Sequence, residues 1–216
     1  MSKKPTGITG PYKVSINSGQ VTGQQEKIAW PSDQKEIERK ILEYFIREFE
    51  KSGAKFLDVK DGGTKELDFL VTTPNGKAYI ELMEVVLADH DQNPYQKGTQ
   101  VHSVADYARK IFENVKNKKI KKYGFNHQTP IDLLLYVTHE QYSPNESAIQ
   151  ALRHYFKENK HPFSYIFFLT PLAEDLIILQ VLFNKDFSFE TPPLEELEKN
   201  TWINLPSSNA KIITQF

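Results

Sequence analysis

The chain of 216 residues is long enough for one domain with a sizeable core, and its 39% hydrophobic and 25% charged residues are typical of a folded globular protein. It has no cysteine, which excludes a disulfide framework, a thiolate zinc site and a cysteine nucleophile. Lys plus Arg total 27 against 28 Asp plus Glu, so the net charge identifies no partner. No stretch resembles a signal peptide or is apolar enough for a membrane span, so we expect a cytoplasmic protein with no membrane partner.

The first predicted helix follows an N-terminal segment of different composition. Residues 1–30 are rich in Gly, Ser, Gln and Thr with little periodicity, which predicts a flexible arm or an added strand. Asp33 and Glu36 then stand at capping-box spacing and predict the start of a helix that ends at Gly53. Four apolar residues at helical spacing form its stripe: Ile37, Ile41, Phe45 and Phe49.

Three strands are predicted next, over residues 56–60, 66–72 and 77–86. The sequence Thr-Pro-Asn-Gly at 73–76 is a strong turn signal and joins the last two strands into a hairpin. The last strand is apolar on both parities, which predicts a central strand covered on both faces.

The remaining chain adds helices and strands in alternation. Residues 89–99 are a polar loop, and an apolar stripe of helical spacing runs from Val101 to Val115. The later elements are a strand over 131–138, a helix over 145–158 and strands over 163–170 and 175–183. This order predicts an α/β fold with three layers, α/β/α, around a central mixed β-sheet. The predicted organisation is a flexible arm (1–30), one domain (31–190) and an acidic C-terminal extension (191–216).

Two carboxylates meet on the predicted hairpin. If the turn lets Thr72 pair with Lys77, Asp68 falls directly opposite Glu81, with Cβ atoms about 4.5–5.5 Å apart. Like charges at that distance repel, so such a pair is kept where a proton or a divalent cation lies between them. A turn with a glycine bulge would shift the register by one residue, and Glu84 would then share the face of Asp68.

These residues and the order of elements resemble the PD-(D/E)XK, or restriction-endonuclease-like, superfamily. The resemblance covers roughly residues 31–140: a helix, Glu-Leu-Asp-Phe-Leu-Val at 66–71, a short turn, and Tyr-Ile-Glu-Leu-Met-Glu at 79–84. It implies that Asp68 and Glu81 bind Mg²⁺ (or Mn²⁺) and activate water for phosphodiester cleavage. It also implies that an acid early in the first helix contributes, for which Glu36 is the best match and Glu43 a poorer one.

The lysine of the superfamily motif is missing, because Met83 stands two residues after Glu81. Some members of the superfamily are thought to supply this cation from the following helix, where Lys118 and Lys119 stand here. The alternative is that activity is lost and the scaffold survives as a binding module.

A lysine cluster follows the second predicted helix: Lys116, Lys118, Lys119, Lys121 and Lys122. Such a cluster can bind a phosphate backbone, although cations also suit a solvated helix end. The leading hypothesis is a Mg²⁺-dependent endonuclease, or nuclease-derived protein, that acts on DNA. The alternative is an inactive nuclease-like module that binds nucleic acid or a partner protein, and a homodimer is left open.

Overall fold

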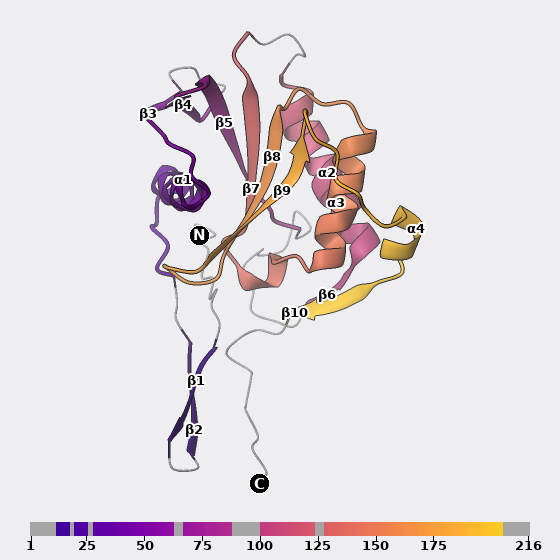
Figure 1. The fold of residues 1–216 in the computed structure, drawn as a ribbon. Coiled ribbons are helices and arrows are strands. Elements are labelled where there is room, and N and C mark those ends of the chain that lie inside the picture. Colours follow the sequence, from indigo (N-terminus) through magenta and orange to yellow (C-terminus); the bar gives the residue numbers. More distant parts are fainter. Residues whose placement is uncertain are drawn as a thin grey trace.

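A six-stranded sheet forms the centre of the computed structural model, in the order β3-β4-β5-β7-β8-β9. The structure describes residues 12–17, 20–25, 28–62, 67–87, 100–123 and 128–204. The sheet lies between α1 on one face and α2 with α3 on the other (Figure 1). The predicted three-layer α/β/α fold with a central mixed sheet is confirmed.

The strands of this sheet are β3 (Asp58–Asp61), β4 (Phe69–Thr73), β5 (Gly76–Glu84), β7 (Ile131–Tyr136), β8 (Tyr165–Pro171) and β9 (Ile177–Asn184). The longer helices are α1 (Gln34–Lys51), α2 (Val104–Val115) and α3 (Glu146–Glu158). The shorter ones are η1 (Lys116–Ile120), η2 (Glu140–Tyr142) and α4 (Leu194–Leu197). The order α1, β3, β4, β5, α2, β7 reproduces the order predicted from the sequence.

The register of the β4–β5 hairpin is the one that the turn predicts. Thr72 pairs with Lys77 and Thr73 with Gly76, so the one-residue shift does not occur. Gly76 has a φ of 131°, which a residue with a side chain rarely adopts. Strand β5 pairs antiparallel with β4 and parallel with β7, and is therefore a central strand.

Helix α1 begins where the capping signal predicts. The Asp33 side chain accepts hydrogen bonds from the backbone N–H groups of Lys35 and Glu36, at 2.9 and 3.2 Å. Its apolar stripe covers one face of the sheet, in a core built mainly from these residues: Ile37, Ile41, Phe45, Val71, Ile80, Leu82, Leu134 and Phe167.

The other face of the sheet is covered by α2 and α3. Each helix starts at a polar cap: Ser103 accepts from the backbone N–H of Asp106, and Asn145 accepts from that of Ala148. The core on this face combines strand and helix residues such as Met83, Tyr107, Ile111, Val115, Leu133, Leu135, Leu152 and Phe168. Both faces of β5 are thus buried, as its apolar parities predict.

Described segments near both termini form paired strands. Strands β1 (Tyr12–Asn17) and β2 (Gln20–Gln25) pair as an antiparallel hairpin within the region interpreted as a flexible arm. Near the C-terminus, β10 (Thr201–Asn204) pairs with β6 (Gln100–Ser103), and Leu197 of α4 joins the core beneath α2 and α3. The segment interpreted as an acidic extension therefore packs on the domain, up to residue 204.

Two further sequence predictions concern a loop and membrane-spanning helices. The predicted loop at 89–99 lies outside the described residues. Within the described part of the chain, none of the helices has the length and apolar character needed to cross a membrane.

Candidate functional site

The two predicted carboxylates meet where β4 and β5 stop pairing. The backbone pairing ends at Phe69 with Ile80, and the next pair along the same register is Asp68 with Glu81. Here side chains replace the ladder bonds. The backbone N–H of Asp68 donates to Glu81 Oε2 at 3.2 Å, and that of Leu82 donates to Asp68 Oδ2 at 2.7 Å. Each carboxylate is thus anchored by the strand that carries the other.

A close backbone approach fixes Asp68 from the other side. The N–H of Gly62 donates to the Asp68 carbonyl at 2.9 Å. A Cβ atom at position 62 would lie 2.3 Å from the carbonyl oxygen of Leu67, so the chain at this point has room only for glycine. The place of Asp68 therefore depends on the segment after β3 as well as on the hairpin.

Lys119 supplies the positive charge of the site. Its Nζ forms an ion pair and hydrogen bond with Glu81 Oε1, and the two side chains are 16% and 2% exposed. Burial of a charge costs free energy unless an opposite charge lies beside it, and here each of the two charged groups is the partner of the other. The residues are 38 positions apart in the sequence, so the contact is made by the fold. Lys118, the other candidate, is exposed.

The end of α2 explains why Lys119 reaches the sheet. The buried stripe of α2 runs through Ile111 and Val115, and the next buried side chain is Tyr123. Lys119 stands between Val115 and Tyr123, four residues from each, and continues the stripe with a long cationic side chain. The turn η1 that carries it is a π-helix, a rare form that is frequent at functional sites.

Burial governs the electrostatics of Glu81. Loss of water around it raises the pKa of this carboxyl, and the nearby charge of Asp68 raises it further. The charge and hydrogen bond of Lys119 and a hydrogen bond with the Tyr123 side chain act in the opposite direction, and the net pKa shift is upward. Tyr123 was not predicted as a site residue, although its spacing from Val115 and Lys119 is a signal that could have identified it.

The acid that α1 brings to this site is Glu38, not the predicted Glu36. Burial raises the pKa of Glu38, and the charges of Asp68, Glu81 and Lys119 act on it as well, so it lies within their range. Its Oε1 accepts a hydrogen bond from Gln34 Nε2, at 3.2 Å.

Glu36 points to a different surface. Two residues along an α-helix are about 200° apart around its axis, so Glu36 and Glu38 lie on different sides of α1. Glu36 lines a shallow hollow on α1 together with Glu43, Glu174 and the cations of that surface. Glu43, the poorer match, lies in the same hollow.

The other residues of the β5 motif take no part in the site. Met83 is buried in the apolar core under α2 and α3. Glu84 lies three positions after Glu81, so the two side chains point to opposite faces of β5. Thr138 donates a hydrogen bond to Glu84 Oε1. The alternative pairing of Asp68 with Glu84 is therefore not formed.

The predicted lysine cluster lies on and just beyond η1, and its member Lys119 contacts Glu81. Lys116 and Lys118 are exposed, and Lys116 Nζ lies 3.5 Å from Glu113 Oε1. Lys121 Nζ donates to Asn117 Oδ1 at 2.7 Å, and Lys122 Nζ lies 5.1 Å from the centre of the Tyr123 ring.

The donor set fits a small divalent cation held by few protein ligands. Among the described residues, no group of three or more His, Asp and Glu side chains could hold a metal ion. Asp68 and Glu81 nevertheless offer the carboxylate oxygens that Mg²⁺ prefers, and Mg²⁺ is usually held by one or two carboxylates with water and substrate phosphate. A carboxylate has about four acceptor sites, so the hydrogen bonds described above leave lone pairs for a metal.

Comparison with known proteins adds little to this geometry. No protein-family model and no curated protein matches the sequence. A solved structure of SfsA from Pyrococcus furiosus in complex with Ca²⁺ is similar at 13% sequence identity, over 78% of this chain and 74% of that one, with a TM-score of 0.26. A TM-score of this size does not establish a shared fold.

Proposed function

We propose that the protein is a metal-dependent endonuclease of the PD-(D/E)XK type that hydrolyses DNA phosphodiester bonds. One observation carries the proposal: a buried lysine from another element pairs with Glu81 directly beside the opposed Asp68. The superfamily motif consists of two acids and a lysine, and the fold assembles these three groups although Met83 replaces the lysine in the sequence. The order α1, β3, β4, β5, α2, β7 also agrees with the superfamily core.

Asp68 and Glu81 would be the metal ligands. A Mg²⁺ or Mn²⁺ ion bound there would lower the pKa of a bound water and neutralise charge on the phosphate. The backbone bonds from Leu82 and Asp68 hold both carboxylates in place before any ligand binds. This preorganisation avoids the cost of ordering the side chains during the reaction.

Lys119 would take the role of the missing lysine. Its ammonium lies beside Glu81, where it can stabilise the growing negative charge on a phosphate or orient the attacking water. Glu38 would accept a proton or hold a water from the side of α1, because its raised pKa favours proton uptake nearer to neutral pH than that of an exposed glutamate.

The exposed lysines near the site would bind the DNA backbone. Lys116, Lys118, Lys121 and Lys122 lie on or just after η1, the same turn that delivers Lys119. Contacts of this type bind phosphates without reading sequence and make affinity strongly dependent on salt.

A second candidate function is an inactive module that binds nucleic acid or a partner protein. It is favoured by the hydrogen bonds and ion pair that already engage both oxygens of Glu81, together with the lack of a third metal ligand among the described residues. This module would bind DNA through the lysine cluster and cleave it under no metal condition. A homodimer, a protein partner and a cytoplasmic location remain predictions from the sequence.

A cleavage assay with matched variants tests the proposal. Plasmid DNA, linear duplex, single-stranded DNA and RNA are incubated with Mg²⁺ or Mn²⁺. We expect Asp68→Ala and Glu81→Ala to abolish cleavage, and Lys119→Met to slow it by about 10²–10³.

The control variants are Glu36→Ala and Glu43→Ala, which alter exposed acids in the hollow on α1 and should leave the rate near that of the wild type. Circular dichroism confirms that each variant is folded. Undiminished cleavage by folded Asp68→Ala and Glu81→Ala would overturn the assignment, and binding without cleavage by the wild type would favour the inactive module.

A further inference from the structure

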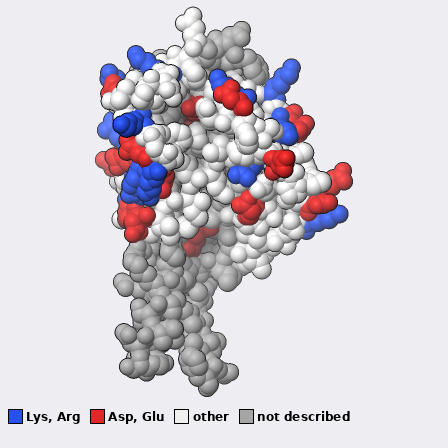
Figure 2. All heavy atoms as spheres, in the orientation of Figure 1, with Lys and Arg blue, Asp and Glu red and all other residues white. Residues whose placement is uncertain are grey.

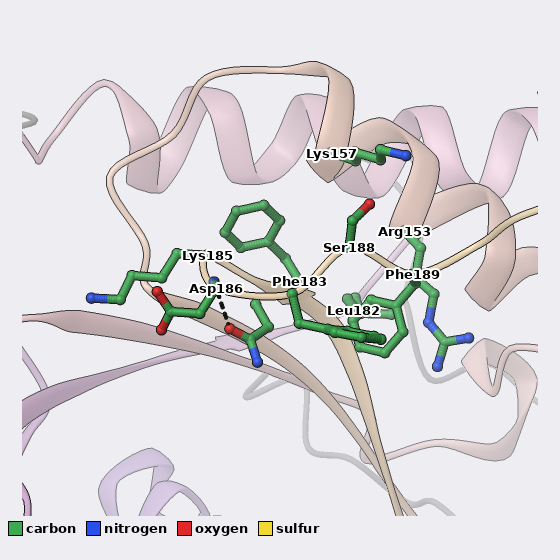
Figure 3. Close-up of a pocket in the computed structure, with 10 residues that line it drawn as sticks. Arg153, Lys157, Leu182, Phe183, Lys185, Asp186, Ser188 and Phe189 are labelled. Carbon is green, nitrogen blue, oxygen red and sulfur yellow. Dashed lines mark hydrogen bonds between the residues drawn. The ribbon is translucent and has the colours of Figure 1, made fainter.

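A second hollow lies between α3 and the segment that follows β9, and it shares no residue with the carboxylate site. Its volume is about 390 Å³. This is within the range of roughly 300–1,000 Å³ that small-molecule sites usually have. It is lined by residues of α3, of the end of β9 and of the following turn (Figure 3): Arg153, Lys157, Leu182, Phe183, Asn184, Lys185, Asp186, Phe187, Ser188 and Phe189.

Cations outnumber anions around this hollow. Arg153, Lys157 and Lys185 face a single acid, Asp186. Figure 3 shows Lys157 and Ser188 on one side of the aromatic rings, and Lys185 with Asp186 on the other. Lys157 and Lys185 are exposed, and neither forms a salt bridge with any residue that the structure describes. The charge of Lys185 acts on the buried Asp132, whereas Lys157, in the last turn of α3, is open to an anion.

Arg153 is used differently from the two lysines. Its Nε donates to the carbonyl of Val181 at 3.0 Å, and its guanidinium lies 4.7 Å from the centre of the Phe189 ring. These contacts attach the turn after β9 to α3 and hold the Phe189 ring in a fixed position. The wall of the hollow is therefore formed before a ligand binds.

Aromatic rings supply the apolar part of the hollow. Phe187 is 62% exposed, although burial of a phenyl ring normally stabilises a fold. It packs edge-to-face against Phe189, with ring centres 5.3 Å apart and an interplanar angle of 84°. This packing holds a largely exposed ring in the lining of the hollow, where a flat ligand can stack on it.

We infer that this hollow is a nucleotide-binding site, with the phosphate near Lys157 and Ser188 and the base against Phe187. An aromatic ring that carries a phosphate is the ligand chemistry that matches phenyl rings and an exposed lysine around one hollow, because bases stack on aromatic side chains and lysine binds phosphate. The nucleotide can be free or can be one unit of a single strand. The inference does not rest on the carboxylate site.

Calorimetric titration of the full chain with AMP tests this inference. We expect binding by the wild type and a loss of about tenfold or more in affinity for Lys157→Ala and for Phe187→Ala, as expected for loss of a phosphate contact or of base stacking. Lys160→Ala, an exposed lysine just beyond α3 that does not line the hollow, is the matched control and should bind as the wild type does.

Two further ligands test the phosphate part and the base part of the site separately, and they distinguish a free nucleotide from one within a single strand. Inorganic phosphate should bind more weakly than AMP and should be insensitive to Phe187→Ala. A five-nucleotide single strand that binds much more tightly than AMP, and that AMP displaces, identifies a strand-binding site, whereas equal or weaker binding identifies a free nucleotide.

The inference is wrong if neither AMP nor the strand binds, or if both bind equally well to Lys157→Ala and Phe187→Ala. The Asp68→Ala/Glu81→Ala variant should bind AMP as the wild type does. AMP binding therefore persists even if the nuclease assignment fails, and the two failures can be told apart.

Discussion

Two ion pairs in this protein have the same chemistry in opposite surroundings. On the outer surface of α1, Lys40 Nζ lies 2.7 Å from Glu174 Oε1, and the side chains are 22% and 53% exposed. Figure 2 shows that acidic and basic side chains alternate over this part of the molecule. In the carboxylate site, Lys119 and Glu81 are 16% and 2% exposed, and Asp68 adds a second negative charge.

The difference between the pairs indicates their roles. The α1 pair belongs to a network in which Glu174 also accepts a hydrogen bond from Tyr44, and Arg47 donates to its carbonyl at 2.6 Å. This network attaches the β8–β9 connection to α1, so it has a structural explanation. The buried pair also joins two elements, η1 and β5, but it removes the charge of Glu81 from water beside a second carboxylate, Asp68. This arrangement carries a cost in solvation that the α1 pair avoids, and such costs are concentrated at functional sites.

The largest predicted loss of stability follows from breaking the buried pair of Lys119 and Glu81. Lys119→Met keeps the length of the side chain and removes its charge, which leaves Glu81 buried without its ion-pair partner. We expect the free energy of unfolding to fall by about 3–5 kcal/mol. Urea unfolding followed by circular dichroism measures this change.

A double variant separates lost charge from lost packing. Glu81→Gln removes the second charge, so Glu81→Gln/Lys119→Met should recover most of the stability lost in Lys119→Met. If the double variant is no more stable than Lys119→Met, the burial of an unpaired carboxylate is not the cause.

A smaller effect is expected at Gly62, which shapes the site without carrying a charge. In Gly62→Ala the new methyl group would meet the Leu67 carbonyl, so the segment that leads to Asp68 must shift. We expect a loss of about 1–3 kcal/mol, typical of overpacking, together with weaker metal binding although both carboxylates remain. Gly53→Ala is the control, since its positive φ of 91° also disfavours alanine but no atom lies near the new methyl group.

Asp132 on β7 is a third acid whose pKa is raised by burial, and fewer interactions favour its charged form than at Glu81. Burial raises its pKa to about 7, although a hydrogen bond from the backbone N–H of Tyr165 and the charge of Lys185 act against this. The folded state therefore holds a proton that the unfolded state has lost between about pH 4 and 7. The contribution of Asp132 is favourable below about pH 4 and is lost as the pH rises towards 7.

Asp132→Asn should consequently stabilise the protein at pH 8, by up to about 4 kcal/mol, and change it little at pH 4. Unfolding curves of both proteins across this pH range provide the measurement. Equal pH dependence in the wild type and the variant would show that Asp132 is not the titrating group.

The smallest effect is expected for the exposed pair. Lys40→Ala should lower the free energy of unfolding by about 0–1 kcal/mol, because water and salt already screen the charges at this surface. A loss as large as that of Lys119→Met would remove the contrast between the two pairs.

The hairpin could be predicted from the sequence because its determinants are local. Thr-Pro-Asn-Gly sets the turn and favours the register in which Thr72 pairs with Lys77, and this register forms instead of the one-residue shift that the sequence left open. The opposition of Asp68 and Glu81 follows from that register alone. The fold class was predictable for a similar reason, since helix and strand periods alternate clearly along the chain.

The contributions of the helices depend on tertiary arrangement and were only partly predictable. The stripe of α1 is flanked by Glu36 on one side and Glu38 on the other, and the side that faces the hairpin depends on how α1 lies on the sheet. The choice of Lys119 over Lys118 follows from its four-residue spacing from the buried Val115 and Tyr123, but its contact with Glu81 depends on how α2 and η1 pack against the sheet. The β1–β2 hairpin and the β6–β10 pair have weak periodicity, so the sequence offered an added strand only as an alternative to a flexible arm and did not predict the β6–β10 pair.

Calorimetric titration with Mg²⁺ and Mn²⁺ tests the central claim most directly, with and without a DNA duplex present. The wild type should bind metal, the Asp68→Ala/Glu81→Ala variant should not, and Glu36→Ala should bind as the wild type does. Calcium, which can occupy such a site without supporting cleavage, keeps the duplex intact in the control titration. Metal binding that is unchanged in the double variant, or absent from the wild type both with and without DNA, would contradict the account.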